Sequence, residues 1–126
     1  MRDPFEYAVI RLVPRMERGE QINVGVILYC QGRDFLAART HLDVDRLRAV
    51  DPGVDVEAVR AGLRAWEAAC AGDQAGGPAA ANLGPGERFG WLTAPRSTVI
   101  QTGPVHTGLT DDPAAELDHL LDVLVC

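Results

Sequence analysis

The pattern of apolar and polar positions divides the first forty residues into three strand-like segments. Residues 5–13, 22–30 and 35–41 are rich in β-branched, aromatic and other apolar residues, a composition typical of strands. Residues 22–30 carry apolar side chains on both faces, as expected for an interior strand covered on two sides. The short polar connections between these segments favour an antiparallel meander.

Helical periodicity replaces the strand pattern in the next thirty residues and returns at the end of the chain. A short helix is predicted from Asp43, as N-cap, to about residue 50. Residues 56–71 have apolar positions three and four apart, which predicts a helix with one buried stripe. The last helix is expected to begin with Asp112 as N-cap and Pro113 in its first turn.

Between these helices the sequence predicts a loop followed by more strands. Residues 72–86 consist largely of Gly, Ala and Pro and read as a flexible loop. Residues 88–93 and 97–102 have strand character, and residues 105–109 are expected to continue the second strand or bend away from it. This order predicts an α+β fold with a mainly antiparallel sheet of about four to five strands and two or three helices packed on one face. Residues 1–126 are expected to form a single domain.

Composition narrows the class of protein. Apolar residues make up 47% of the chain and charged residues 24%, as in soluble globular proteins. The net charge of -6 opposes broad attraction to nucleic acid or to an anionic membrane. All 12 basic residues are arginine, which excludes lysine chemistry and indicates a GC-rich, bacterial genome.

The three cysteines and the apolar runs point to a cytoplasmic location. Cys30, Cys70 and Cys126 are far apart and odd in number, so reduced thiols are expected. The apolar runs are far shorter than the roughly 20 residues that span a bilayer, so no membrane is expected. The cysteines and histidines lack the spacing of a zinc site, and we predict no metal and no cofactor.

Polar side chains concentrate in residues 96–107, in a context that otherwise resembles a strand. Arg96 is suited to hold a phosphate or carboxylate, and His106 is the catalytic candidate because imidazole exchanges protons near neutral pH. The hydrogen-bonding candidates beside them are Ser97, Thr98, Gln101 and Thr107. Alternatively, these groups solvate one sheet face and satisfy turns, because a regular strand would point them to opposite sides.

Two further candidates lie in or beside the second predicted strand. Arg18, in the first hairpin loop, could reach the Arg96 segment. Asn23 lies in an apolar strand and needs hydrogen-bond partners if it is buried, so it either has a structural role or contacts a ligand. Gly25 in the same strand predicts a bulge or a close backbone approach.

Three segments carry a family resemblance. Residues 7–11 (YAVIR), 18–28 (RGEQINVGVIL) and 92–113 (LTAPRSTVIQTGPVHTGLTDDP) resemble the bacterial domain-of-unknown-function 3037 family. The resemblance covers nearly the whole chain, with residues 72–86 as its variable part. It implies no established activity, cofactor or catalytic residue. Genes of this family often lie beside genes for HipA-like kinases, which implies a protein partner.

These observations lead to two hypotheses. The first is a non-enzymatic protein-interaction or regulatory module that partners a HipA-like kinase through residues 96–107; it predicts an exposed apolar or arginine-rich patch. The second is an enzyme or small-molecule binder acting on a phosphate- or carboxylate-bearing ligand. It requires a cleft where Arg96 and His106 converge, to which Arg18 or Arg39 could contribute. Sequence-specific nucleic-acid binding is disfavoured because the chain has no basic helix.

Overall fold

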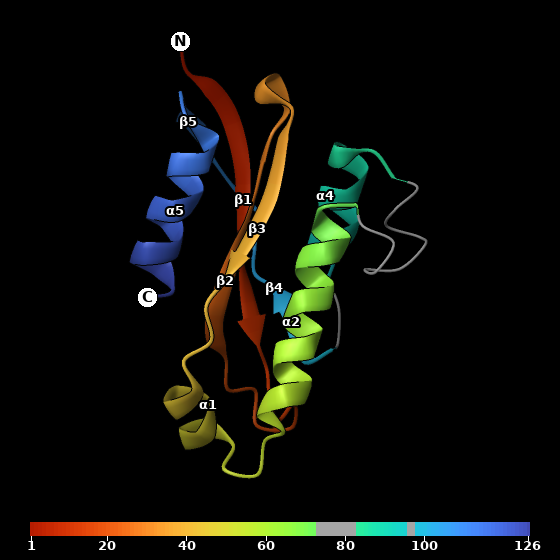
Figure 1. Cartoon of the computed structure of the whole chain (residues 1–126), viewed down its shortest axis with the longest axis vertical. Helices are drawn as coiled ribbons and strands as arrows, with labels where there is room; N and C mark the ends of the chain where they lie inside the picture. The colour runs from red at the N-terminus through yellow and green to blue at the C-terminus, as the bar shows by residue number, and fades with distance from the viewer. Residues whose placement is uncertain (73–82, 96–97) are drawn as a thin grey trace.

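The computed structural model describes residues 1–72, 83–95 and 98–126 (Figure 1). Its first three strands form the predicted antiparallel meander: β1 (Asp3–Leu12), β2 (Ile22–Cys30) and β3 (Phe35–Thr40). A short 3-10 turn, η1 (Gln31–Arg33), joins β2 to β3. Leu28 on β2 lies opposite Tyr7 on β1 and Ala37 on β3, so β2 is an interior strand.

Two short strands complete the sheet along a single edge of β1. Both β4 (Ile100–Thr102) and β5 (His106–Thr110) pair antiparallel with β1. β4 lies beside Ile10–Leu12, near the end of β1, and β5 lies beside the stretch from Asp3 to Tyr7. The strand predicted at 97–102 is therefore shorter than expected, and the chain bends before it pairs again as β5.

Helices cover both faces of the sheet. The described helices are α1 (Val44–Val50), α2 (Val56–Cys70), α4 (Pro85–Thr93) and α5 (Pro113–Leu124). The predicted caps are confirmed, since the side chain of Asp43 accepts the backbone N–H of Arg46 at 3.2 Å and that of Asp112 accepts the N–H of Ala115 at 3.1 Å. No helix in the described ranges is long and apolar enough to cross a bilayer.

The α+β class and the antiparallel sheet are confirmed, but the helices in the described ranges number four and are not confined to one face. α2 and α4 lie on one side of the sheet and α5 lies on the other (Figure 1). The first side buries Ile27 of β2 together with Trp66, and the second buries Val26 of β2 together with Leu117. Since neighbouring residues of β2 are apolar in both directions, both faces require a covering layer.

Residues 88–93 were expected to form a strand, and this prediction is wrong. They form most of α4, which begins at Pro85 with Gly84 as N-cap. Proline is favoured in the first turn of a helix, where its missing N–H costs nothing. Phe89 and Leu92, three residues apart, are both buried on the side of α4 that faces the core. The helix also shortens the loop predicted at 72–86, of which residues 73–82 lie outside the described part.

A bulge changes the register between β1 and β2. Ile10 lies opposite Gly25 and Arg11 lies opposite Asn23, which leaves Val24 without a partner on β1. The prediction made from Gly25 is confirmed, because a Cβ atom there would lie 2.6 Å from the carbonyl oxygen of Arg39. The bulge brings Asn23 and Arg11 side by side on the face that carries α5.

Candidate functional site

The fold separates the predicted site residues into several groups. β1 lies between β2 and the two edge strands, so Asn23 does not pair with residues 98–107. Arg18 lies exposed in the loop after β1 and forms an ion pair with Glu20. Arg96 and Ser97 lie outside the described residues. The structure therefore does not describe a contact between Arg18 and the Arg96 segment.

Thr98 and Gln101 make local hydrogen bonds at the entrance to β4. The hydroxyl of Thr98 donates to the carbonyl oxygen of Ile100 at 2.7 Å. The side-chain amide of Gln101 donates to the carbonyl oxygen of Thr98, also at 2.7 Å. Both bonds hold the turn that leads into the strand, which is the structural role considered for this polar segment.

His106 and Thr107 are neighbours on β5 and point to opposite faces of the sheet. The ring of His106 lies beside Tyr7, with ring centroids 5.3 Å apart. Thr107 lies opposite Glu6 and lines a pocket of about 480 Å³ together with Tyr29. One small ligand therefore cannot contact both side chains from the same side of the sheet.

The arginines considered as partners for His106 lie elsewhere. Arg39 is on β3, at the opposite edge of the sheet, and its guanidinium forms a 2.6 Å ion pair with Asp118 of α5. Arg18 is in the loop between β1 and β2. The three described pockets include neither arginine nor His106. Neither arginine is therefore placed to act with His106 in one of these pockets.

The outer edge of the sheet exposes apolar side chains instead. Residues 98–110, which we call the edge segment, contain β4, β5 and the bend between them. Three apolar side chains of this segment are exposed: Val99 at 42%, Val105 at 41% and Leu109 at 59%. Such a concentration of exposed apolar side chains in one short segment is typical of a surface that another molecule covers.

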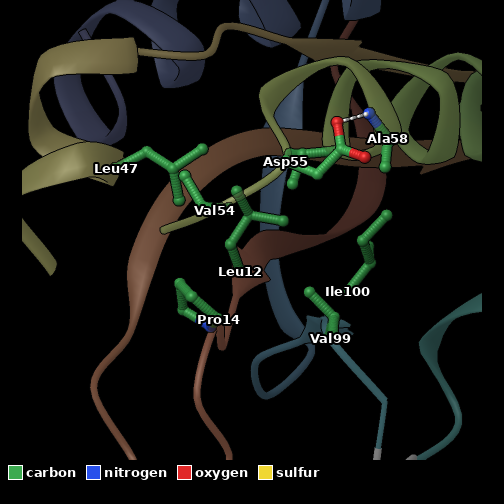
Figure 2. Close-up of a pocket in the computed structure, with 9 residues that line it drawn as sticks. Leu12, Pro14, Leu47, Val54, Asp55, Ala58, Val99 and Ile100 are labelled. Atoms are coloured by element: carbon green, nitrogen blue, oxygen red, sulfur yellow. Dashed lines mark hydrogen bonds between the residues drawn. The ribbon is translucent and has the colours of Figure 1, made fainter. Parts of the chain in front are cut away.

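An apolar pocket opens beside the start of the edge segment (Figure 2). Its volume is about 300 Å³. Val99 and Ile100 line one wall, and the remaining lining comes from the end of β1, from Pro14 in the loop after it, and from the α1–α2 region. Asp55 is the acidic group among the lining residues, and its carboxylate accepts the backbone N–H of Ala58 at 3.1 Å as the N-cap of α2. The pocket therefore suits an apolar side chain.

Arg11 is a residue that the sequence analysis did not single out. Among the described arginines, only Arg11 and Arg88 are partly buried. Arg88 donates to the carbonyl oxygens of Cys70 and Leu83 at 3.1 and 2.7 Å. Arg11 forms no hydrogen bond or ion pair with any described residue. The signal that could have identified it is that Arg11 is the one basic residue in the apolar segment 5–13.

Two of the three thiols lie inside the protein. Cys30 and Cys70 are buried and Cys126 is exposed. Burial raises the pKa of the Cys70 thiol to about 12, which keeps it protonated and unreactive. No group of three or more His, Cys, Asp or Glu side chains in the described part of the chain could hold a metal ion.

The comparisons with known proteins identify a family. A model described as a protein of unknown function, DUF3037, matches residues 7–125. That match includes all three segments on which the resemblance was based. Neither a curated protein nor a solved structure matches the chain.

Proposed function

Because the chain belongs to the DUF3037 family of proteins of unknown function, we propose a role from its own surface: it is a non-enzymatic protein-interaction module that binds a partner through the edge segment. The observation that carries this proposal is the exposure of Val99, Val105 and Leu109 within eleven consecutive residues. The apolar pocket beside Val99 supports it, since a side chain of the partner can enter there.

The apolar contact of the edge segment supplies part of the free energy of a specific complex, and the rest must come from further contacts with the partner. Full burial of a Val or Leu side chain contributes roughly 1.5–3 kcal/mol. The three side chains of the edge segment are partly exposed, so together they contribute less than three full burials. A micromolar complex has a binding free energy of about -8 kcal/mol, and filling the pocket adds to the contribution of the edge segment.

A HipA-like kinase is the partner that the family resemblance suggests, and the module would then bind or regulate that kinase. The alternative, an enzyme or small-molecule binder acting on a phosphate- or carboxylate-bearing ligand, has less support. It needs acid–base and anion-binding groups in one cleft, whereas His106 lies on the sheet face beside Tyr7 and Arg39 is paired with Asp118.

The proposal is tested with a purified HipA-like kinase from the same genome, using calorimetry. The variant Val99→Ser, Val105→Ser, Leu109→Ser removes the apolar side chains of the edge segment. The matched control is Val123→Ser, which changes an apolar side chain of α5 that is 61% exposed. We expect the triple variant to bind at least tenfold more weakly and the control to bind as the wild type does.

Affinity capture from native cells accompanies this measurement, in case the partner is another protein. A captured protein counts only if the triple variant loses it, the control keeps it and the purified pair binds. The proposal is wrong if the kinase does not bind and every captured protein is retained equally by the triple variant. Circular dichroism establishes beforehand that all variants fold.

A further inference from the structure

Arg11 lies in a row of polar side chains that crosses three strands. It is opposite Asn23 on β2 and opposite Gln101 on β4. Residues directly opposite each other on antiparallel strands point to the same face. Asn23 donates to the carbonyl oxygen of Leu124 in α5, so the row lies on the α5 side of the sheet. α5 packs mainly over β2 and β3, which leaves the β1–β4 end of the row accessible.

The guanidinium of Arg11 is the unsatisfied group of this row. The side-chain amide of Asn23 is used by Leu124, and that of Gln101 is used by Thr98. Arg11 is half-buried, yet it has no anionic partner and no hydrogen-bond acceptor among the described residues. Partly buried charges are ordinarily paired, because desolvation without compensation is costly. Arg88, the other half-buried arginine described, follows that rule.

Gly103 provides the space that the guanidinium occupies. A Cβ atom at Gly103 would lie 2.8 Å from both Cζ and one terminal nitrogen of Arg11. The side chain of Arg11 therefore lies against the backbone of the bend between β4 and β5. Any larger residue at position 103 would displace it.

We propose that Arg11 binds the carboxylate of an Asp or Glu side chain supplied by a protein partner. This inference rests on the proposed function and specifies the chemistry of the partner. The planar guanidinium offers parallel N–H donors that match a carboxylate with two hydrogen bonds. Gly103, against which the guanidinium lies, belongs to the edge segment, so Arg11 borders the surface proposed for the partner.

Charge complementarity favours a carboxylate over a phosphate. A phosphate dianion is ordinarily held by several basic groups, and no second described arginine accompanies Arg11, because Arg39 is paired with Asp118. A partner carboxylate would satisfy the donors and restore electroneutrality at the same time. Arginine is also among the residues that contribute most to binding at protein interfaces.

Partner binding is measured for four variants of the full chain. Arg11→Met keeps the aliphatic stem and removes the charge; we expect its affinity to fall by roughly 30-fold or more. Arg11→Lys keeps the charge but loses the planar guanidinium, so its affinity for the partner should lie between those of Arg11→Met and the wild type. Gly103→Ala displaces the guanidinium and should also weaken binding. Arg64→Met, an exposed arginine of α2, is the control and should bind normally.

A second measurement needs no partner. The side-chain Nε–H signals of the arginines are followed by NMR while sodium acetate is added at constant ionic strength, with inorganic phosphate in a parallel titration. We expect acetate to shift the Arg11 signal with an affinity roughly tenfold higher than that of Arg64. Equal weak shifts at both residues, or tighter binding of phosphate than of acetate, would overturn the proposal.

The two proposals fail in different ways. If the edge-segment variant loses the partner while Arg11→Met retains it, the carboxylate inference is wrong and the interaction module stands. If no partner binds but acetate binds selectively at Arg11, the interaction module loses its support and the carboxylate site stands as a small-molecule site. Thermal unfolding of Arg11→Met and Gly103→Ala shows whether a loss of binding reflects a loss of folding.

Discussion

The side-chain amide of Asn23 on β2 donates a hydrogen bond of 3.1 Å to the carbonyl oxygen of Leu124, the last residue of α5. The last four carbonyl groups of a helix have no partner inside the helix. Asn23 therefore satisfies one of them and attaches the end of α5 to the sheet. The sequence left open whether this residue is structural or contacts a ligand, and the bond supports the structural role.

Replacement of Asn23 should lower stability. Asn23→Ala removes the donor and leaves the half-buried carbonyl of Leu124 without it, so we expect a loss of about 1–2 kcal/mol in the free energy of unfolding. Asn23→Asp also removes the donor; its negative charge is unfavourable near the helix C-terminus but favourable opposite the guanidinium of Arg11, so its stability relative to Asn23→Ala measures the balance of the two. Urea unfolding measures both effects, with Gln21→Ala, an exposed neighbour, as the control. If Asn23→Ala is as stable as the wild type, the amide is free to serve a ligand.

Two glycines should respond in opposite directions to alanine. At Gly25 the added methyl group would meet the backbone oxygen of Arg39 at 2.6 Å, and backbone cannot move aside as a side chain can. Gly25→Ala should therefore destabilise the protein by roughly 1–3 kcal/mol. At Gly90, in the middle of α4, nothing lies within 4 Å of the new methyl group. Gly90→Ala should stabilise the helix by about 0.5–1 kcal/mol.

Thermal and chemical unfolding of these two variants also tests the element assignments. Alanine is favoured over glycine in both helices and strands, but it is the most favourable helix residue and is depleted in strands, so a strand at residues 88–93 would gain less. A destabilised Gly90→Ala variant would contradict α4, and an unaffected Gly25→Ala variant would contradict the close approach at the bulge.

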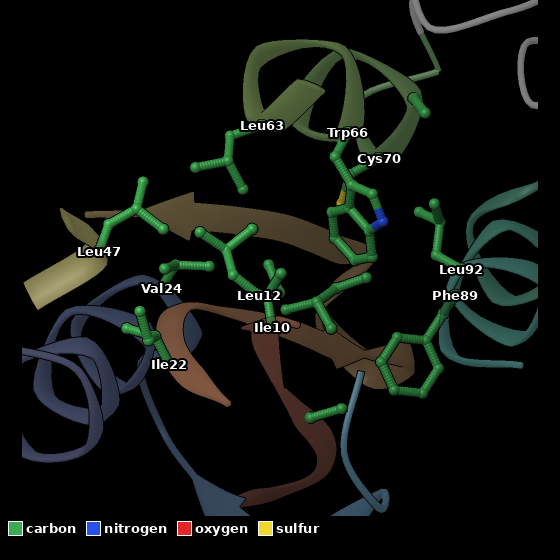
Figure 3. Close-up of a cluster of buried hydrophobic side chains, with 13 residues drawn as sticks. Ile10, Leu12, Ile22, Val24, Leu47, Leu63, Trp66, Cys70, Phe89 and Leu92 are labelled. Carbon is green, nitrogen blue, oxygen red and sulfur yellow. The ribbon is translucent and has the colours of Figure 1, made fainter. Parts of the chain in front are cut away.

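Only one thiol should react in the native protein. Cys126 is exposed, whereas Cys70 is 1% exposed and packs in the cluster that contains Trp66, Phe89 and Leu92 (Figure 3). The Sγ atom of Cys30 is buried and donates to the carbonyl oxygen of Pro4 at 3.5 Å. A thiol reagent at pH 8 should modify one cysteine in the folded chain and three in guanidinium chloride. Cys126→Ser should abolish the native reaction, and a persistent reaction would show that a core cysteine is accessible.

The buried thiol of Cys70 also predicts a loss of stability in alkali. Its pKa rises from 9.0 to about 12 in the folded chain, chiefly because burial disfavours the thiolate. Above pH 9 the unfolded state releases this proton while the folded state retains it. The stability contributed by the protonated thiol is therefore complete below pH 9 and declines as the pH rises to about 12.

Unfolding measured between pH 8 and 12 checks this linkage. The wild type should lose stability more steeply than Cys70→Ala, by at most about 1.4 kcal/mol for each pH unit. The comparison between pH 8 and 12 is not complicated by lysine, because the chain has none. The tyrosines and the other two cysteines are present in both proteins, so their titration cancels in the comparison. Equal slopes would show that Cys70 titrates normally in the folded state.

Most of the fold could be predicted because its elements are marked by local chemistry. Apolar runs bounded by Pro14 and by turn residues identify the meander, and aspartate caps identify α1 and α5. α4 could not be recognised because its short apolar window contains Phe, Trp and Thr, which favour strands, and its start lies among residues typical of loops. Burial of Phe89 and Leu92 against the sheet decides the outcome, and that contact is not local (Figure 3).

The candidate site was less predictable, because it depends on strand order. The alternation of a regular strand already indicates that His106 and Thr107 point to opposite faces, but it does not show that His106 lies beside Tyr7 or that Thr107 lies opposite Glu6. It also gives no indication that the bulge brings Asn23 opposite Arg11, or that Gly103 lies beneath the guanidinium. These relationships arise only when three distant segments become adjacent strands.

The division of one sheet edge between β4 and β5 has a consequence for how this surface can be used. The strands are separated by Gly103, Pro104 and Val105, and Pro104 has no N–H to donate. The outer edge therefore presents no uninterrupted ladder of backbone donors and acceptors onto which an extended peptide could be added along its whole length. Recognition at this edge must rely on side chains, and the same interruption protects the exposed apolar residues from joining sheet to sheet in fibrils.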